Sequence, residues 1–149
     1  MEIINQALDG IQLISPSIYE DSRGFFVEKL NTNIINDFDI KQINISSNFN
    51  KGTLRGLHFQ YGVGLENKII YCLKGRIFDV FVDLRKTSKT YRQTYSIELG
   101  DLNKGVLIPS GCAHGFQTLE KNTTVLYFHS NIYNSSTESG IIYNDKQLN

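Results

Sequence analysis

The fold of this chain is decided by residues 68–83, which read KIIYCLKGRIFDVFVD. Both halves are rich in β-branched and aromatic side chains, which favour strands, and Lys74-Gly75 between them is typical of a tight turn. We therefore expect a β-hairpin that extends to Arg85. A two-residue loop makes Lys68 and Asp79 diagonal neighbours on one face of this hairpin, close enough to interact.

The predicted pairing of Lys68 with Asp79 has two interpretations. An ion pair on the solvated face of a hairpin is ordinary. The same face also carries apolar side chains, however, and charges are rarely placed on a partly buried apolar wall without a function. These apolar neighbours are Ile70, Cys72, Ile77 and Phe81.

Short strand-like runs continue on both sides of this hairpin, separated by turns. Nine or ten short strands with little helix predict one all-β domain over residues 1–149, a sandwich or jelly roll that encloses a small-ligand cavity. Residues 32–38 are the only candidate for a short helix, with Thr32 as its N-cap. The other expected strands are residues 3–4, 11–14, 25–30, 42–46, 54–60, 95–99, 106–116, 123–128 and, at an edge, 140–143.

Charge and cysteine content limit the partners of the chain. Fifteen Lys and Arg balance 15 Asp and Glu, so the formal net charge is zero. No overall field attracts nucleic acid or an anionic membrane, so we expect neither as a partner, and an anionic ligand must be held by local charge. Cys72 and Cys112 lie far apart without CxxC spacing, and the N-terminus has no signal-peptide or transmembrane pattern. We therefore expect a cytoplasmic protein with reduced thiols.

Residues 52–60, GTLRGLHFQ, have the composition of an active site. Arg55 supplies a permanent cation, His58 an imidazole and the nearby Lys68 an amine. Strict alternation puts Arg55 and His58 on opposite faces of a strand, so they share a pocket only if a bulge or twist at Gly56 resets the register. A lone histidine in a strand is more often structural than catalytic, and His58 gains interest only from these neighbours.

Two further polar features have an ordinary interpretation and a functional one. Gln42 and Asn44 alternate with isoleucines, and such a polar strand face is usually solvated, although neutral amides also line sugar and nucleotide pockets. Arg23 lies in the turn 21–24, where a solvated side chain is the simplest expectation.

Several segments, taken together in order, carry a resemblance to a known family. They are residues 21–28 (DSRGFFVE), 54–60 (LRGLHFQ), Lys68, residues 78–85 (FDVFVDLR), residues 108–116 (IPSGCAHGF) and Tyr127. They resemble the motifs of the dTDP-4-dehydrorhamnose 3,5-epimerases, and the match covers nearly the whole chain. The resemblance implies a cupin-type jelly roll, also called a double-stranded β-helix, that forms a homodimer and needs no metal or other cofactor. It also implies an isomerase that inverts C3, C5 or both in a dTDP-linked 4-keto-6-deoxyhexose, for rhamnose and surface polysaccharide biosynthesis.

The resemblance also implies roles for single residues. His58 is then the base that removes the proton beside the ketone, Lys68 stabilises the enolate oxygen, and Tyr127 returns a proton from the opposite ring face. Inversion of a carbon beside a carbonyl needs a base to remove the proton, a cation or hydrogen-bond donor at the enolate oxygen, and an acid to return a proton. The positions implied to bind substrate are Arg23, Glu28, Gln42, Asn44, Arg55, Gln60, His114, Tyr133 and Glu138.

One departure from the family concerns the partner of the base. In the family, the aspartate that pairs with the catalytic histidine follows the position of Asp145 in a longer C-terminal segment that this sequence does not contain. Either another carboxylate orients His58, with Asp79 or Asp83 as candidates, or the base is weaker. Inversion of only one carbon, or a different nucleotide sugar, is also compatible with this departure.

Two alternatives to the epimerase remain. A metal-dependent cupin enzyme is suggested by His58, Gln60, Glu66 and His114, which loosely resemble a cupin ligand set. It is disfavoured because Gln60 replaces the usual second histidine. A non-catalytic cupin that binds a nucleotide sugar is the other alternative.

Overall fold

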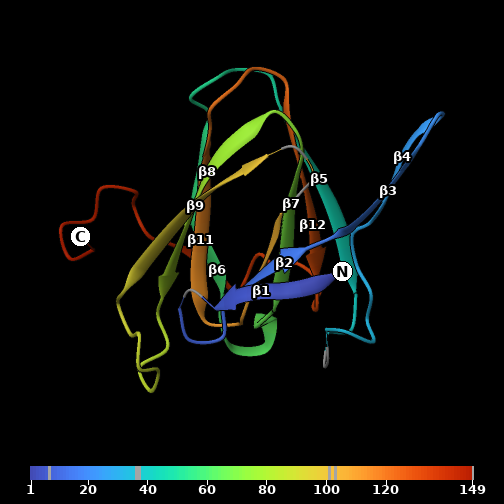
Figure 1. Ribbon diagram of the computed structural model, residues 1–149. Coiled ribbons are helices and arrows are strands. Elements are labelled where there is room, and N and C mark those ends of the chain that lie inside the picture. The colour runs from blue at the N-terminus through green and yellow to red at the C-terminus, as the bar shows by residue number, and fades with distance from the viewer. Residues whose placement is uncertain (7, 36–37, 101, 103, 149) are drawn as a thin grey trace.

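The computed structural model describes residues 1–6, 8–35, 38–100, 102 and 104–148. Two antiparallel sheets pack face to face as a sandwich (Figure 1). The six-stranded sheet has the order β1 (Glu2–Gln6), β2 (Gln12–Ser15), β10 (Gly105–Ile108), β7 (Lys68–Lys74), β12 (Thr123–His129) and β5 (Gln42–Asn48). The five-stranded sheet has the order β13 (Glu138–Gly140), β6 (Leu54–Gln60), β11 (Cys112–Thr118), β8 (Arg76–Asp83) and β9 (Thr94–Gly100). The all-β prediction is confirmed.

Two smaller elements lie beside the sandwich. Among the described strands, β3 (Ser17–Asp21) and β4 (Gly24–Glu28) pair only with each other, and they form a hairpin that projects away from the two sheets (Figure 1). The 3-10 helix η1 (Gly62–Gly64) precedes β7. Among the described residues, no helix is long and apolar enough to span a membrane.

The main core fills the space between the two sheets. Ile70 and Cys72 from β7 meet Ile77 and Phe81 from β8 there, and all four have no exposed surface. Burial of an aliphatic or aromatic side chain of this kind contributes about 1.5–3 kcal/mol. The apolar faces of both strands were therefore predicted correctly from the sequence.

The predicted hairpin from Lys68 to Arg85 is wrong. The strands β7 and β8 are consecutive but belong to opposite sheets, so their apolar faces meet across the core. Gly75, with φ of 74°, turns the chain from one sheet to the other, and a Cβ there would lie 2.5 Å from Thr123 Oγ1. The expected pairing of Lys68 with Asp79 is wrong for the same reason, since the sheet neighbours of Lys68 are Ile108 and His129.

Chain segments cover the outer faces of both sheets. Ile35 and Phe38 pack with Ile69 and Tyr71 over the six-stranded sheet, while Ile141 lies with others over the five-stranded sheet. The expected helix at 32–38 is a set of turns over residues 32–35, and residues 36–37 lie outside the described residues. Ile35 and Phe38 are thus buried against the sheet although the chain forms turns here. Apolar residues at helical spacing can be buried without a regular helix.

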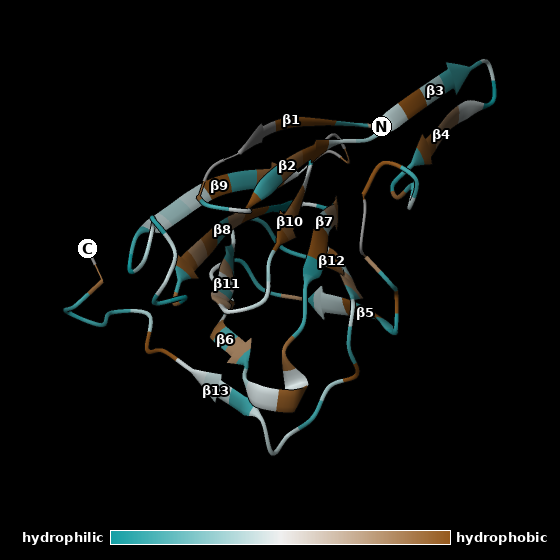
Figure 2. Cartoon of the chain, turned by 90° about the horizontal axis from the view of Figure 1, so that it is seen from below, coloured by the Kyte–Doolittle hydropathy of each residue, from teal (hydrophilic) through white to brown (hydrophobic). Residues whose placement is uncertain are grey.

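The hairpin β3–β4 keeps an apolar surface uncovered. The hydropathy colours in Figure 2 show apolar residues on both of its strands. Its exposed large apolar side chains are Ile18, Tyr19, Phe25 and Phe26. The strand β3 was not expected from the sequence, whereas β4 was.

Candidate active site

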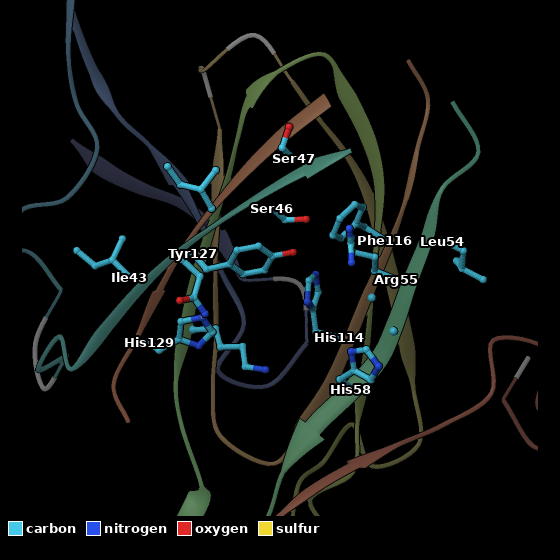
Figure 3. A pocket seen from close by; sticks show the side chains of 15 residues that line it. Ile43, Ser46, Ser47, Leu54, Arg55, His58, His114, Phe116, Tyr127 and His129 are labelled. Carbon is cyan, nitrogen blue, oxygen red and sulfur yellow. The ribbon is translucent and has the colours of Figure 1, made fainter. Parts of the chain in front are cut away.

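A cavity of about 960 Å³ opens between the two sheets (Figure 3). Strands β5, β7 and β12 of the six-stranded sheet form one wall, and β6 and β11 of the five-stranded sheet form the other. The chain has three histidines, and all of them line this cavity: His58, His114 and His129.

A bulge in β6 brings Arg55 and His58 into the same cavity. Between β11 and β6, His114 pairs with His58 and Phe116 pairs with Arg55, so three steps on β6 oppose two on β11. Gly56 lies within this bulge with φ of 105°, and a Cβ there would lie 2.5 Å from the Cα of Gly115. The register reset on which the sequence prediction depended is therefore present.

His58 lies on the five-stranded wall with an exposed side chain. No carboxylate of the described residues contacts its ring, and neither carboxylate expected to support it does so. Asp79 bonds to His114 instead, through Oδ1 at 2.6 Å from Nε2. Asp83 is bound by Arg85 and by neighbouring hydroxyls, with 2.9 Å between Arg85 Nε and Asp83 Oδ1.

The pair of Asp79 and His114 is buried, although His114 lines the cavity. Asp79 has no exposed surface, and its second oxygen, Oδ2, has no hydrogen-bond partner among the described residues. Burial raises the pKa of Asp79, while His114 opposes that rise. The His114 ring lies 5.5 Å from the Phe81 ring and 6.3 Å from the Tyr127 ring, so it is fixed between aromatic neighbours.

Tyr127 extends into the cavity from β12, on the wall opposite His58 (Figure 3). Burial raises the pKa of Tyr127 well above its usual range, and the charge of Asp79 adds to this, whereas Arg55 lowers it. The phenol therefore keeps its proton at neutral pH and can act as a proton donor.

Lys68 reaches the cavity from the start of β7 and is joined there by Glu66. Lys68 Nζ lies 2.9 Å from Glu66 Oε1, and His129 Nδ1 lies 2.8 Å from Glu66 Oε2. Burial raises the pKa of Glu66, but His129 and Lys68 outweigh it, so the pKa is lowered and the group is a carboxylate. Sequence reasoning overlooked His129, although period-two alternation on β12 places it on the same face as Tyr127.

Six of the remaining expected substrate-binding residues lie at a cavity, in three groups. Arg55 lines the cavity and donates from Nε to Asn48 Oδ1 at 2.7 Å. Gln42 and Asn44 lie on β5, with 3.0 Å between Gln42 Nε2 and Asn44 Oδ1, and Asn44 lines the large cavity. The residues Gln60, Tyr133 and Glu138 line an adjoining cavity of about 150 Å³ that also contacts His58 and Lys68.

Within this third group, Tyr133 is fixed at both ends. Its backbone N–H donates to Gln42 Oε1 at 2.9 Å, and its hydroxyl donates to Glu138 Oε2 at 2.8 Å. The hydrogen bond to Glu138 raises the pKa of Tyr133. Gln60 lines the same small cavity but is almost fully buried, and it is hydrogen-bonded to Thr137.

Arg23 and Glu28 do not line either cavity of their own chain. Arg23 lies at the tip of the β3–β4 hairpin, where its side chain is 88% exposed and pairs with Asp21 at 2.6 Å. Glu28 lies at the base of the same hairpin, 3.6 Å from the N-terminal amine of Met1.

The candidate metal ligands are not gathered at one point. Glu66 is shared by Lys68 and His129, and His114 is bound to Asp79. Over the described ranges, no cluster of three or more His, Cys, Asp or Glu is arranged to hold a metal ion.

Comparison with known proteins finds the same family from sequence and from structure. The family model described as dTDP-4-dehydrorhamnose 3,5-epimerase matches residues 5–149. A protein of that name from Salmonella typhimurium is 37% identical over 153 residues, which cover 99% of this chain and 84% of the relative.

Solved structures agree closely. The dTDP-4-dehydrorhamnose 3,5-epimerase of Bacillus anthracis, determined with TDP and PPi bound, has a TM-score of 0.95 and 37% identity, covering 99% of this chain and 87% of that one. A 3,5-epimerase of Legionella pneumophila in complex with dTDP-4-keto-L-rhamnose has a TM-score of 0.91 and 36% identity, covering 99% and 80%. The cupin-type jelly roll expected from the sequence is thereby confirmed.

Proposed function

Since this chain belongs to the dTDP-4-dehydrorhamnose 3,5-epimerase family, we propose that its cavity binds a dTDP-linked 4-keto-6-deoxyhexose between His58 and Tyr127. The chain is a nucleotide-sugar epimerase and thus an isomerase. The observation that carries the assignment of residues is the position of these two groups on opposite walls of a cavity that Lys68 also lines. A base and an acid on opposite sides of a sugar ring are what inversion of one carbon requires.

The proposed reaction moves only protons. His58 removes the proton from a carbon beside the ketone, and the electron pair of that C–H bond moves to the carbonyl oxygen, which forms an enolate. The ammonium of Lys68 stabilises this oxygen in the cavity. Tyr127 then donates its proton to the same carbon from the opposite face. No net oxidation occurs, so no redox cofactor is required.

Local charge supports binding of the diphosphate. The chain has no net charge, but Arg55 extends into the cavity. Its Nε donates to Asn48, which orients the guanidinium so that its other N–H groups can bind the diphosphate. The amides of Gln42 and Asn44 and the Tyr133–Glu138 pair provide polar groups towards the nucleotide end.

A homodimer explains the position of Arg23 and Glu28. Both residues lie on a hairpin that projects from its own sandwich and carries four exposed apolar side chains. An uncovered apolar surface of this kind is typical of an interface. We propose that residues 1–149 are one domain and that the hairpin of one subunit contributes Arg23 to the cavity of its partner. We also propose a cytoplasmic location, where the buried thiols of Cys72 and Cys112 stay reduced.

The test of this function is deuterium exchange. The purified protein is incubated with dTDP-4-keto-6-deoxyglucose in deuterium oxide, and C3 and C5 are followed by NMR. We expect deuterium at both carbons for a 3,5-epimerase, and exchange at one carbon would make it a monofunctional epimerase. His58→Asn is the control and should not exchange. Tight binding without exchange in the unmodified protein would contradict catalysis and favour a non-catalytic binding protein.

A further inference from the structure

The carboxylate of Glu66 is held at both oxygens. Lys68 Nζ occupies Oε1 at 2.9 Å, and His129 Nδ1 occupies Oε2 at 2.8 Å. The Glu66 and Lys68 side chains are 6% and 14% exposed, so solvent competes little for these bonds. A buried carboxylate with a fixed donor on each oxygen cannot rotate without losing one of them, and it therefore fixes the direction of the Lys68 ammonium.

His129 also contacts two groups on the other side. Its ring stacks on Tyr127 with 5.8 Å between centroids and 16° between planes. Its Nε2 lies 3.4 Å from Asn44 Nδ2. The His129 imidazole thus contacts Tyr127, the proposed acid, and the amide of Asn44 on β5. Through Glu66 it is also linked to Lys68, the proposed enolate-stabilising group.

A backbone group sets the direction of this whole chain of hydrogen bonds. The Tyr133 N–H can only donate, so it fixes Oε1 of Gln42 towards itself and Nε2 of Gln42 towards Asn44 Oδ1. The Asn44 Nδ2–H then faces His129 Nε2, which must accept. The proton of His129 consequently lies on Nδ1, where it donates to Glu66.

We propose that Glu66 and His129 are positioning residues for the epimerisation. They hold the side chains of Lys68 and Tyr127 in fixed positions relative to the amide of Asn44 on β5. This inference rests on the proposed function. Neither residue needs to touch the reacting atoms: Glu66 acts through Lys68, and His129 acts through Glu66, Tyr127 and Asn44. A misplacement of about 1 Å at a stabilising group can cost about 100-fold in rate, which is the scale of effect expected here.

The first test replaces Glu66 by Gln, which keeps the shape and removes one acceptor. Its amide group must face Lys68 or His129, both of which are donors. We expect kcat to fall about 10- to 100-fold, with KM changed less than about threefold. The matched control is Glu98→Gln, which removes a carboxylate from an exposed pair with Arg76. It should leave both constants unchanged, and an unchanged kcat in Glu66→Gln would overturn the proposal.

Two substitutions of His129 separate its two contacts. In His129→Asn, the amide nitrogen takes the position of Nδ1 and can donate to Glu66, but nothing reaches Asn44. In His129→Gln, the amide oxygen takes the position of Nε2 and can accept from Asn44, but the donor to Glu66 is lost. We expect the larger fall in kcat in His129→Gln and the larger rise in KM in His129→Asn. Equal effects of the two variants would contradict positioning of Lys68 through Glu66.

A spectroscopic measurement keeps this inference separate from the proposed function. Long-range ¹H–¹⁵N NMR of the ligand-free protein should show His129 as the Nδ1–H tautomer, and Glu66→Gln should disturb that signal. The Nε2–H tautomer would overturn the inference even if the protein is an active epimerase. Absence of deuterium exchange in the unmodified protein, together with the Nδ1–H tautomer, would instead count against the proposed function alone.

Discussion

The three histidines of the cavity differ in their partners. His114 is paired with Asp79 and His129 with Glu66, whereas His58 has no carboxylate partner in the described part of the chain. A carboxylate on one ring nitrogen fixes the tautomer and the orientation of an imidazole. The residue implied to be the base is thus the histidine with the least restrained ring, whereas one fixed histidine lies on its own wall and the other on the opposite wall.

Replacement of Tyr127 by Phe should separate proton removal from inversion. The phenol is protonated at rest, because burial raises its pKa, and it lies across the cavity from His58. Without it, His58 can still remove and return the proton on one face. We expect inversion to fall by at least about 100-fold while deuterium still enters with retained configuration, as NMR of the sugar protons would show. Normal inversion in this variant would remove Tyr127 from the mechanism.

Asp83 is expected to act in stability and not in catalysis. Burial raises its pKa, but hydrogen bonds from Arg85, Ser88 and Thr90 outweigh this and lower the pKa well below its usual range. The unfolded chain therefore binds the proton more readily. The stabilisation is present above the unfolded pKa of about 3.9 and is lost as the pH falls through the folded pKa.

Asp83→Asn should accordingly lower the free energy of unfolding by about 1–3 kcal/mol at pH 7, because charged hydrogen bonds are lost. The difference from the unmodified protein should shrink as the pH is lowered below about 4. Urea unfolding at several pH values measures both. If a folded Asp83→Asn variant lost epimerisation, Asp83 would have a role in catalysis, and the assignment to stability would be wrong.

At the scale of elements, alternation predicts a strand more reliably than it predicts the neighbour of that strand. The apolar faces of β7 and β8 were foreseen because period two is a local property. Their membership of opposite sheets was not, because a tight turn at Gly75 is compatible with both a hairpin and a crossing between sheets. The resemblance implied that His58, Lys68 and Tyr127 share a site, and all three line one cavity, whereas the pairing of Glu66 with His129 depends on which sheet β7 joins.

The bulge in β6 gives a prediction at this scale. Gly56→Ala puts a Cβ 2.5 Å from the Cα of Gly115 at a φ of 105°, so we expect a loss of about 2–4 kcal/mol and of activity. Gly52→Ala is the matched control. It also has positive φ, but nothing lies within 4 Å of the added Cβ, so only about 1–2 kcal/mol should be lost. Equal losses in urea unfolding would mean that close approach to Gly115 does not matter.

For the whole molecule, the question is which chain supplies each side chain of a site. The family resemblance put Arg23 with the other substrate-binding residues, but a sequence cannot tell a contact within one chain from a contact between chains. The structure places Arg23 on a hairpin outside its own cavity. The proposed dimer resolves this if each hairpin reaches the neighbouring sandwich.

Mixed dimers test this arrangement. Arg23→Ala and His58→Ala are each expected to be nearly inactive alone. In a mixed dimer, one site combines an intact His58 with an intact Arg23 from the partner, and the other site lacks both. Co-expression should therefore restore about a quarter of the normal activity, since about half of the dimers are mixed. No gain over the separate variants would contradict a contribution of Arg23 across the interface.

The crossing of the chain between sheets at Gly75 also affects how the protein is made. In the part of the chain that the structure describes, β5 pairs only with β12, while β6 pairs only with β11 and β13, so these two strands have no sheet partner until residues 112–140 exist. A nascent chain on the ribosome can form β1–β2, β3–β4 and β8–β9, but the buried strand β7 has no sheet partner until β10 at residues 105–108 has been made. Such a delay favours slow, largely post-translational folding and makes the unfinished chain a client for chaperones that cover apolar strands.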